Sequence, residues 1–191
     1  AVTIDASAPT TTVSIDSISD DSGSSASDFI TNDNDGLTIN ATLSSELGAD
    51  ETLQVSIDGG TTFTTVPASE ITGTSVAHVA AGLTASATVQ FRVVDTAGNP
   101  GPVATQAVTI DASAPTTTVS IDSISDDSGS SASDFITNDN DGLTINATLS
   151  TALGADETLE VSIDGGTTFT TVPASAITGT SVAHVAPGRT A

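Results

Sequence analysis

The sequence predicts an all-β fold built from two β-sandwich units in tandem, end to end. The first reason is a direct repeat: residues 107–191 copy residues 1–85 at an offset of 106, and 79 of these 85 positions are identical. The second reason is an alternation of apolar and polar residues with period two, which is typical of strands, while no helical period is sustained. Such a repeat is too long for a solenoid unit of roughly 20–50 residues, but it matches one small sandwich domain.

About seven short strands make up the full unit, with turn signals between them, which is the pattern of a two-sheet sandwich. Leu37, Ile39 and Leu43 alternate with polar residues in one of these strands. The sequence Asp58-Gly59-Gly60 is a turn signal between two others. The predicted strands of the first unit are residues 10–15, 37–43, 53–57, 62–66, 76–79, 89–93 and 108–110.

Two prolines, Pro9 and Pro115, mark the joints between units. Because Pro115 favours an extended conformation in the residue before it, we expect a short, stiff linker. The chain begins and stops in mid-pattern, so we expect it to be a fragment of a longer array. The predicted divisions are a tail strand of an upstream repeat at residues 1–6, a first repeat at 7–111, and a second at 112–191 that lacks a counterpart of residues 86–106. A sandwich without those strands would expose its core.

The composition allows only a small hydrophobic core, with few aromatic side chains. Hydrophobic residues make up 37% of the chain, with five Phe and no Trp, Tyr, Met or Cys. Units of this size are marginally stable without added help, and no disulfide can supply it. The lack of cysteine also excludes thiol catalysis and Cys-rich metal sites. Since no serine has a positioned His partner and no phosphate loop is present, we expect the chain not to be an enzyme.

The net charge is strongly negative. Two arginines, Arg92 and Arg189, and no lysine stand against 24 acidic residues, which gives a formal charge of −22. Such a chain is a poor partner for nucleic acid and anionic membranes, and it has no apolar stretch of about 18 residues for insertion into a bilayer. Nineteen of the acids are Asp, the residue of turns and of hard-cation ligation. An acidic surface adapted to salt would explain the charge, but not the crowding of Asp into a few segments.

The densest acidic segment is residues 20–36, whose copy is residues 126–142. Its first 16 residues contain five carboxylates, which repel one another unless a cation lies among them. Calcium suits such a loop, because it takes roughly six to eight oxygens in irregular geometry. The alternative is that these residues simply form turns and a solvated surface. The candidate ligands here are Asp20, Asp21, Asp28, Asp33, Asp126, Asp127, Asp134 and Asp139.

Sandwich topology predicts a further grouping of acids at each pole of the unit. Asp111 ends the last strand, so it should approach the carboxylates of residues 20–36 in its own unit. At the other pole, Asp95 and Asn99, together with Asp50 and Glu51, should approach Asp5 of the preceding linker. Each joint would then collect carboxylates from two units, and calcium would bridge neighbouring domains. The alternative is that Asp95 and Asn99 are ordinary turn residues.

Three other sequence patterns do not indicate a further functional site. The acidic segment is not an EF-hand, because Thr31 and Thr42 occupy the first and twelfth ligand positions. Residues 56–63 approximate the Asp-box hairpin, a motif that braces a turn. His78 and His184 each stand alone on a predicted strand, where a single His is usually a surface or packing residue.

Four segments, residues 2–9, 15–21, 27–33 and 94–99, resemble the bacterial Ig-like extender repeats of giant RTX-type adhesins. The resemblance covers the full unit of about 106 residues and most of the second copy, and it extends to the tandem repeats of ice-binding and biofilm adhesins. It implies Ig-like β-sandwiches rigidified by calcium, in long arrays that hold a terminal ligand-binding region away from the cell. It also implies that the foremost ligands are Asp5, Asp20, Asp21, Asp28, Asp95 and Asp111.

The resemblance therefore predicts a calcium-stabilised structural spacer of a bacterial cell-surface adhesin. We expect an extracellular, monomeric chain whose partners are calcium and the neighbouring repeats, with no nucleic acid bound and no direct membrane insertion. One alternative is an adhesive module that itself binds a surface glycan, although five Phe with no Trp or Tyr argue against it. Another is a homophilic contact between arrays.

Overall fold

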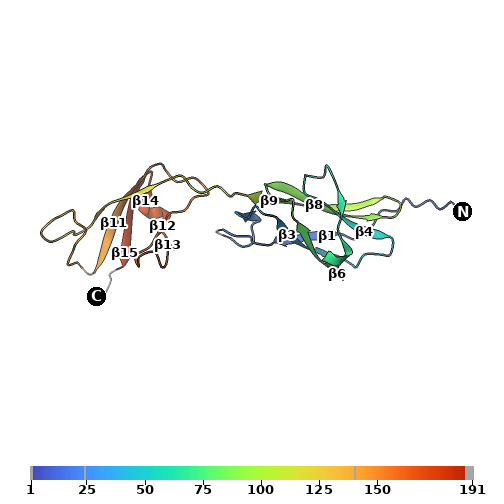
Figure 1. Ribbon diagram of the computed structural model, residues 1–191, viewed down its shortest axis with the longest axis horizontal. Coiled ribbons are helices and arrows are strands. Elements are labelled where there is room, and N and C mark those ends of the chain that lie inside the picture. Colours follow the sequence, from blue (N-terminus) through green and yellow to red (C-terminus); the bar gives the residue numbers. More distant parts are fainter. Residues whose placement is uncertain (1, 24, 140, 188–191) are drawn as a thin grey trace. The chain divides into compact units, whose positions relative to one another are not determined.

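The computed structural model describes residues 2–23, 25–139 and 141–187, and this part of the chain is all-β (Figure 1). Strands make up 42% of it, well above the roughly 20–25% of an average globular domain. The only helical residues described are two 3₁₀ turns, Ala68–Glu70 and Ala174–Ala176, and neither is long enough to cross a membrane. The chain divides into two compact units, Ala1–Ser113 (unit 1) and Ala114–Ala191 (unit 2), close to the predicted boundary after residue 111.

The first sheet of unit 1 is antiparallel and has the order β1-β3-β7-β6. In β3 the period-two pattern is plain, because Leu37, Ile39 and Leu43 are buried while the polar residues between them are only half-buried or exposed. The strands of this sheet are β1 (Val13–Ile18), β3 (Leu37–Leu43), β7 (Ser75–Ala80) and β6 (Ile71–Thr72).

The second sheet of unit 1 has the order β2-β9-β8-β4-β5. Strand β9 pairs with β2 only at Thr109 and Ile110, and this short pairing is parallel. Among the described strands no other partner lies along this edge of β9, and an edge tolerates Pro100 and Pro102 because prolines lack the N–H that an inner strand would donate. The strands are β2 (Ile30–Thr31), β9 (Pro100–Ile110), β8 (Ala87–Asp95), β4 (Glu51–Ser56) and β5 (Thr64–Thr65).

Some predicted strand limits are wrong. The strand predicted at residues 10–15 runs over Val13–Ile18, because its pairing with β3 begins only at Val13 and continues to Ile18. The strand predicted at 62–66 keeps only Thr64–Thr65, since the Asp58 side chain accepts the Thr62 N–H at 2.9 Å and holds that residue in the turn. The last strand is much longer than the predicted 108–110, because an edge strand can include the prolines at its start.

The two sheets of unit 1 enclose one apolar core, formed mainly by aliphatic side chains from both sheets. Phe91, in the middle of β8, is 0% exposed, and its ring and that of His78 form a T-shaped pair with centroids 6.2 Å apart. Leu53 of β4 and Ile39 of β3 are buried against the same cluster. Each sheet thus depends on the other to remove its apolar face from water.

Unit 2 reproduces the first sheet of unit 1 but not the second. Its four-stranded sheet has the corresponding order and the same register, including the same bulge in the first strand. Only a two-stranded ribbon remains of the second sheet in the described residues. The strands are β10 (Val119–Ile124), β11 (Gly142–Leu149), β15 (Ser181–Pro187) and β14 (Ile177–Thr178), with β12 (Glu160–Val161) and β13 (Thr170–Thr171) in the ribbon.

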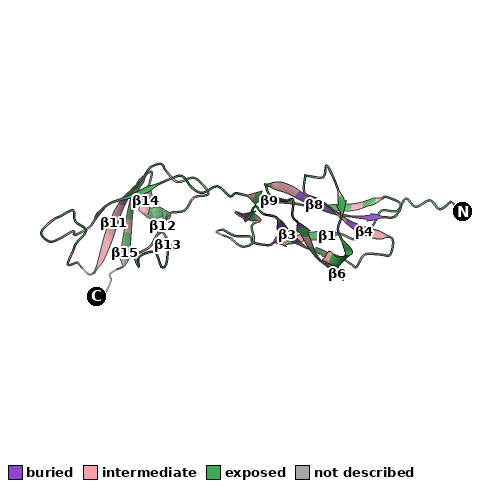
Figure 2. Cartoon of the chain, viewed as in Figure 1, coloured by how far each residue is buried: buried purple, intermediate pink, exposed green. Residues whose placement is uncertain are grey.

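The buried cluster of unit 2 is correspondingly small (Figure 2). Among the described residues it consists of Ala147, Leu149, Val172 and Val182. Ile121 of β10 is 62% exposed, whereas its unit 1 counterpart Ile15 packs against the core. No strand among the described residues of unit 2 corresponds to β8 or β9.

Candidate metal site

The acidic loop of unit 1, residues 20–36, runs from the end of β1 to the start of β3 and forms β2 on the way. The Thr31 side chain, 1% exposed, organises it: its hydroxyl donates to the Asp20 carbonyl and accepts the Asp33 N–H at 3.0 Å. Asp20 and Phe29 adopt left-handed φ angles of 52° and 61°. A bulky aromatic residue in that region is strained, so the surrounding hydrogen bonds hold the loop in one shape.

Asp111 lies beside this loop. Its backbone N–H donates to the Thr31 carbonyl at 2.9 Å, which continues the parallel pairing of β2 with the end of β9. Sandwich topology predicts Asp111 at this pole, and the structure brings its backbone there. The Asp111 Oδ1 accepts the N–H of Ser113 at 2.9 Å.

The Asp21 side chain has one satisfied and one unsatisfied oxygen. Its Oδ2 accepts the Phe29 N–H at 3.2 Å, whereas its Oδ1 is buried and has no hydrogen-bond partner among the described residues. Asp127 repeats this in unit 2, with Oδ2 accepting from Phe135 at 3.1 Å and a buried Oδ1 without a partner. A buried carboxylate oxygen without a donor is costly, so it is a feature that a bound cation would relieve.

Asp35, a further carboxylate of the loop, is perturbed by its acidic neighbours. Asp33 raises the pKa of Asp35 above its ordinary value, through a side-chain hydrogen bond and through its charge, with smaller contributions from burial and from Asp20. In unit 2, Asp139 and Asp126 raise the pKa of Asp141 in the same way. Like charges that disfavour ionisation of a neighbour mark a place where positive charge is stabilising.

Asp35 and Asp141 were not among the candidate ligands predicted from the sequence. The signal was present, because Asp33 and Asp35 follow the alternate-residue spacing of a calcium loop. The predicted candidate Asp28 has a local contact: its Oδ1 accepts the Ile30 N–H at 3.1 Å, and Asp134 does the same for Ile136. Both Asp28 and Asp134 are exposed.

The carboxylates do not form a closed metal cage. No group of three or more His, Cys, Asp or Glu residues in the described part of the chain is already arranged to hold one ion. The donor chemistry of the loop nevertheless fits a hard cation, since Asp21 offers a buried free oxygen and the other carboxylates repel one another. An ion there would complete its shell with backbone, hydroxyl or solvent oxygens, which calcium accepts.

At the opposite pole of unit 1, the predicted carboxylate already has hydrogen-bond donors. Both oxygens of Asp95, which is 8% exposed, are engaged by Asn99: the Asn99 N–H donates to Oδ1 and its amide group to Oδ2, each at 2.8 Å. Hydrogen bonds from the Asn99 side chain and from backbone N–H groups lower the pKa of Asp95, and they outweigh burial, which acts in the opposite direction. Asn99 also donates to the Asp5 carbonyl at 3.2 Å. The three predicted residues do meet, but Asp95 and Asn99 brace a turn, which favours the alternative left open by the sequence.

Asp58 likewise braces a turn. It accepts hydrogen bonds from the Ser56 hydroxyl at 2.6 Å and from the Thr62 backbone at 2.9 Å, and these donors lower its pKa to about 2. In unit 2, Thr168 and Ser162 lower the pKa of Asp164. The Asp-box pattern therefore stabilises the hairpin.

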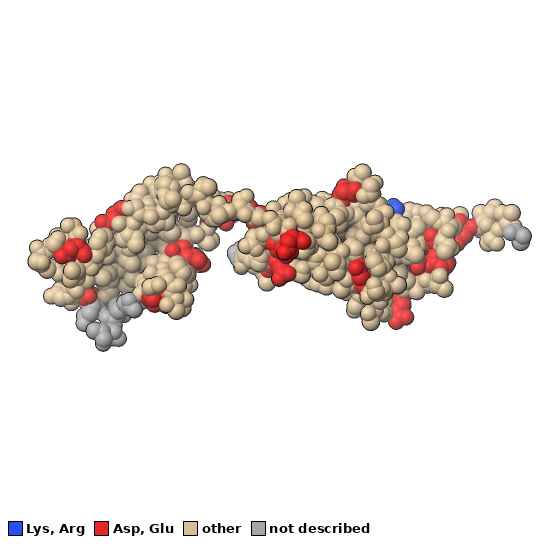
Figure 3. Space-filling view, in the orientation of Figure 1, with Lys and Arg blue, Asp and Glu red and all other residues tan. Residues whose placement is uncertain are grey.

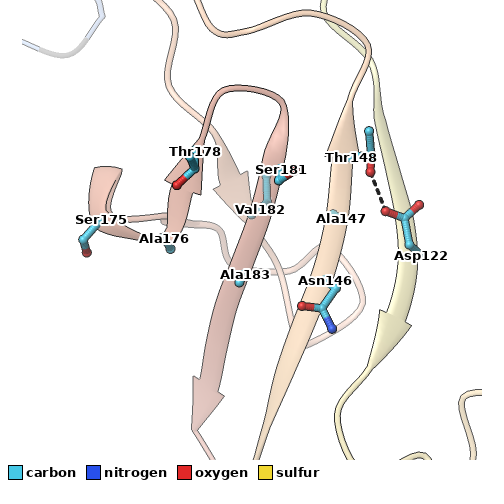
Figure 4. Close-up of a pocket in the computed structure, with 10 residues that line it drawn as sticks. All are labelled: Asp122, Asn146, Ala147, Thr148, Ser175, Ala176, Thr178, Ser181, Val182 and Ala183. Atoms are coloured by element: carbon cyan, nitrogen blue, oxygen red, sulfur yellow. Dashed lines mark hydrogen bonds between the residues drawn. The ribbon is translucent and has the colours of Figure 1, made fainter.

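A shallow hollow lies over the four-stranded sheet of each unit. In unit 2 its volume is about 390 Å³, and the Thr148 hydroxyl donates to Asp122 across neighbouring strands at 2.6 Å (Figure 4). The unit 1 hollow, of about 610 Å³, is lined by the corresponding strands. Neither hollow has an aromatic lining residue, so neither offers the stacking surface typical of sugar sites. The unit 2 lining residues are Asp122, Asn146, Ala147, Thr148, Ser175, Ala176, Thr178, Ser181, Val182 and Ala183.

Acidic side chains gather in separate groups on the visible face of the molecule, where Lys and Arg side chains are nearly absent (Figure 3).

Comparison with protein-family models, with curated proteins and with solved structures finds no match to this chain.

Proposed function

We propose that the chain is a calcium-stabilised structural extender of a bacterial cell-surface adhesin, located outside the cell. In this proposal each full unit is an Ig-like β-sandwich, and tandem units project a distal ligand-binding region. The observation that carries the calcium part is the buried Asp21 Oδ1 without a partner, which recurs at Asp127. The near-identity of the two copies supports the spacer part, because interchangeable units add length without adding a new site.

The acidic loop would hold the ion. Asp21 would contribute its free oxygen, and Asp20, Asp33 and Asp35 would contribute the charges that now repel one another. Calcium supplies positive charge that removes this repulsion and relieves the buried oxygen. The loop's own part is to hold these side chains in place through the Thr31 hydroxyl, which bonds the Asp20 carbonyl and the Asp33 N–H.

The expected gain in stability is moderate. If free calcium exceeds the dissociation constant ten- to a hundredfold, each site adds about 1.4–2.7 kcal/mol to the free energy of unfolding. For a unit of this size such a gain raises the melting temperature by about 5–20 °C. Affinities on the order of 10⁻⁴–10⁻³ M, as in extracellular calcium modules, would suit a calcium-rich exterior.

The duplicated loop provides matched variants for the test. We expect Asp21→Asn to remove the calcium-dependent stabilisation of unit 1 only, and Asp127→Asn to remove that of unit 2 only. Hydrogen exchange with and without chelator would report the two units separately. Asp16→Asn is the control, because this exposed Asp lies outside both predicted groups of acids. Calcium responses that are absent in the parent chain, or unchanged in both loop variants, would contradict the proposal.

The spacer role has its own measurement. If calcium also stiffens the array, small-angle scattering should show a larger maximum dimension with calcium than with chelator. The alternative function, glycan binding, gains no support from the two hollows, because they lack aromatic side chains. A glycan array probed with the calcium-loaded chain separates these functions, since a specific sugar signal would favour the adhesive module.

A further inference from the structure

Unit 1 contains two Asp–Gly pairs, Asp35–Gly36 in the acidic loop and Asp58–Gly59 in the turn before β5. An aspartate followed by glycine can react with its own backbone, because glycine has no Cβ to keep its nitrogen away from the preceding carboxyl group. The reaction needs a backbone nitrogen and a carboxyl group that are both free to move. Since the two dipeptides are chemically identical, any difference in their reactivity comes from the fold.

The fold protects Asp58–Gly59. The Gly59 N–H donates to the Thr88 carbonyl at 3.0 Å, which ties this nitrogen to β8. The Asp58 carboxylate accepts the Ser56 hydroxyl at 2.6 Å and the Thr62 N–H at 2.9 Å. These donors also lower the pKa of Asp58 to about 2, so the group stays ionised and is a poor electrophile. Both reacting groups of this pair are therefore held in hydrogen bonds.

The pair Asp35–Gly36 has no such protection. Asp35 is exposed, and among the described residues its carboxyl group receives no backbone or hydroxyl donor and has a side-chain hydrogen bond only with Asp33. The Gly36 N–H has no hydrogen-bond acceptor within the same described part of the chain. Gly36 lies one residue before β3, whose pairing with β7 begins at Leu37. Its nitrogen is therefore outside the sheet hydrogen bonds that would hold it.

The fold also requires glycine at position 36. Its φ is 112°, a value that L side chains rarely adopt. A Cβ added to Gly36 would lie 2.9 Å from the Ala81 Cα, closer than packed atoms allow. Any larger residue would therefore strain the backbone where the chain enters β3. The reactive pair is thus a consequence of the close approach with which β3 begins.

We infer that Asp35 is a modification site, at which the folded chain converts itself spontaneously to isoaspartate. The Gly36 nitrogen attacks the Asp35 Cγ, so that an N–Cγ bond forms and the amide hydrogen leaves with the carboxyl hydroxyl group as water. Water then adds to the Asp35 backbone carbonyl carbon of this succinimide and breaks its bond to the Gly36 nitrogen. One water molecule leaves and one enters, so the conversion needs no oxidant, reductant or cofactor.

The product changes the acidic loop. The backbone now runs through the former side chain and is longer by a methylene group, while the free carboxylate is attached at Cα. The change falls directly before β3, so it moves the Asp35 carboxylate away from its place beside Asp33. The inference does not depend on calcium, although the modified residue lies in the loop proposed to bind it.

The test incubates the intact, folded chain in chelator, so that its outcome is independent of the proposed calcium function. Isoaspartate has the mass of aspartate but resists an Asp-specific protease, and its peptides separate from the parent peptides by chromatography. Peptides that extend to Ser45 and Glu46 differ in mass from those of the second copy, which contain Thr151 and Ala152. Deamidation of the neighbouring Asn34 is also distinguished, because it changes the mass.

We expect isoaspartate to accumulate at Asp35 at least about tenfold faster than at Asp58, because reaction at Asp58 requires the turn to open and to break several hydrogen bonds. In urea, where the fold is lost, the two rates should become similar. Asp35→Glu is the matched variant, since it keeps the charge but would have to close a larger ring, and it should show no product at residue 35.

Three outcomes would overturn the inference. The first is a folded chain in which Asp35 forms no isoaspartate or reacts less than about tenfold faster than Asp58. The second is a rate at Asp35 that is more than about tenfold lower in the folded chain than in urea, which would mean that the fold protects this pair as well. The third is product that persists in Asp35→Glu, because it would then arise from another residue.

Discussion

Truncation of one leucine in each unit tests whether the second sheet of unit 2 lacks its packing partner. Leu53 of β4 is 1% exposed and pairs with Val93 of β8. Its counterpart Leu159 is only half-buried and belongs to the edge of a four-residue cluster. The two residues share the same local sequence, apart from the change of Gln54 to Glu160 beside them. Leu53→Ala and Leu159→Ala therefore make the same chemical change in two different packing environments.

The expected losses differ by a factor of at least two. Removing a fully buried leucine costs about 3–5 kcal/mol, through lost transfer free energy and the cavity that remains. A half-buried leucine loses only part of the transfer term, about 1 kcal/mol, and leaves an open surface instead of a cavity. For unit 1, a loss of 3 kcal/mol or more lowers the melting temperature by more than about 10 °C.

Urea denaturation followed by hydrogen exchange measures the two losses separately, because peptides from each unit report their own opening free energy. Ile15→Ala is a useful control within unit 1, since this side chain is only partly buried and should cost less than Leu53→Ala. Equal losses for Leu53→Ala and Leu159→Ala would refute the reasoning, because they would mean that Leu159 is packed as completely as Leu53.

Three further outcomes are expected. Glu70→Ala removes the carboxylate that lies 2.6 Å from His78 and gives unit 1 the residue found in the second copy, and it should cost unit 1 about 0.5–1 kcal/mol in a urea titration. Asp58→Ala removes a carboxyl whose folded-state pKa is about 2, so the parent chain should lose stability as pH falls from about 4 to 2 while the variant shows a flatter profile in thermal melts. Asp35→Asn should raise the melting temperature in chelator at pH 7, because a folded-state pKa above the ordinary value means that the ionised form destabilises the fold; the gain should vanish as pH falls below 4.

The strands with regular alternation could be predicted from the sequence, and those that depend on distant pairing could not. Alternation identifies β3 and β8, where apolar residues occupy every second position. Strand β2 has only two residues and owes its existence to pairing with β9, about 80 residues further along the chain. The length of β9 was missed because Pro100 argues against a strand unless its edge position is known.

For the candidate site, the sequence predicted the acidic loop but not the roles of its members. The concentration of Asp in residues 20–36 indicates a cation loop on charge alone. Which oxygen lies buried without a donor depends on the fold of the loop, and the structure assigns it to Asp21. Asp95 was a reasonable candidate by charge, but Asn99 already satisfies both of its oxygens. Such hydrogen bonds depend on turn geometry that residue types do not specify.

The comparison of the two units separates what the sequence specifies locally from what it specifies through partner strands. The buried, unpartnered oxygen recurs at Asp127, and the left-handed φ of Phe29 recurs at Phe135, even though unit 2 has no pairing equivalent to β2 with β9 in its described residues. The shape of the acidic loop is therefore specified by its own hydrogen bonds. Sheet extent is not, since nearly identical residues form six-residue β4 in one unit and two-residue β12 in the other. Calcium binding by the acidic loop of unit 2 should thus not require a pairing like that of β2 with β9.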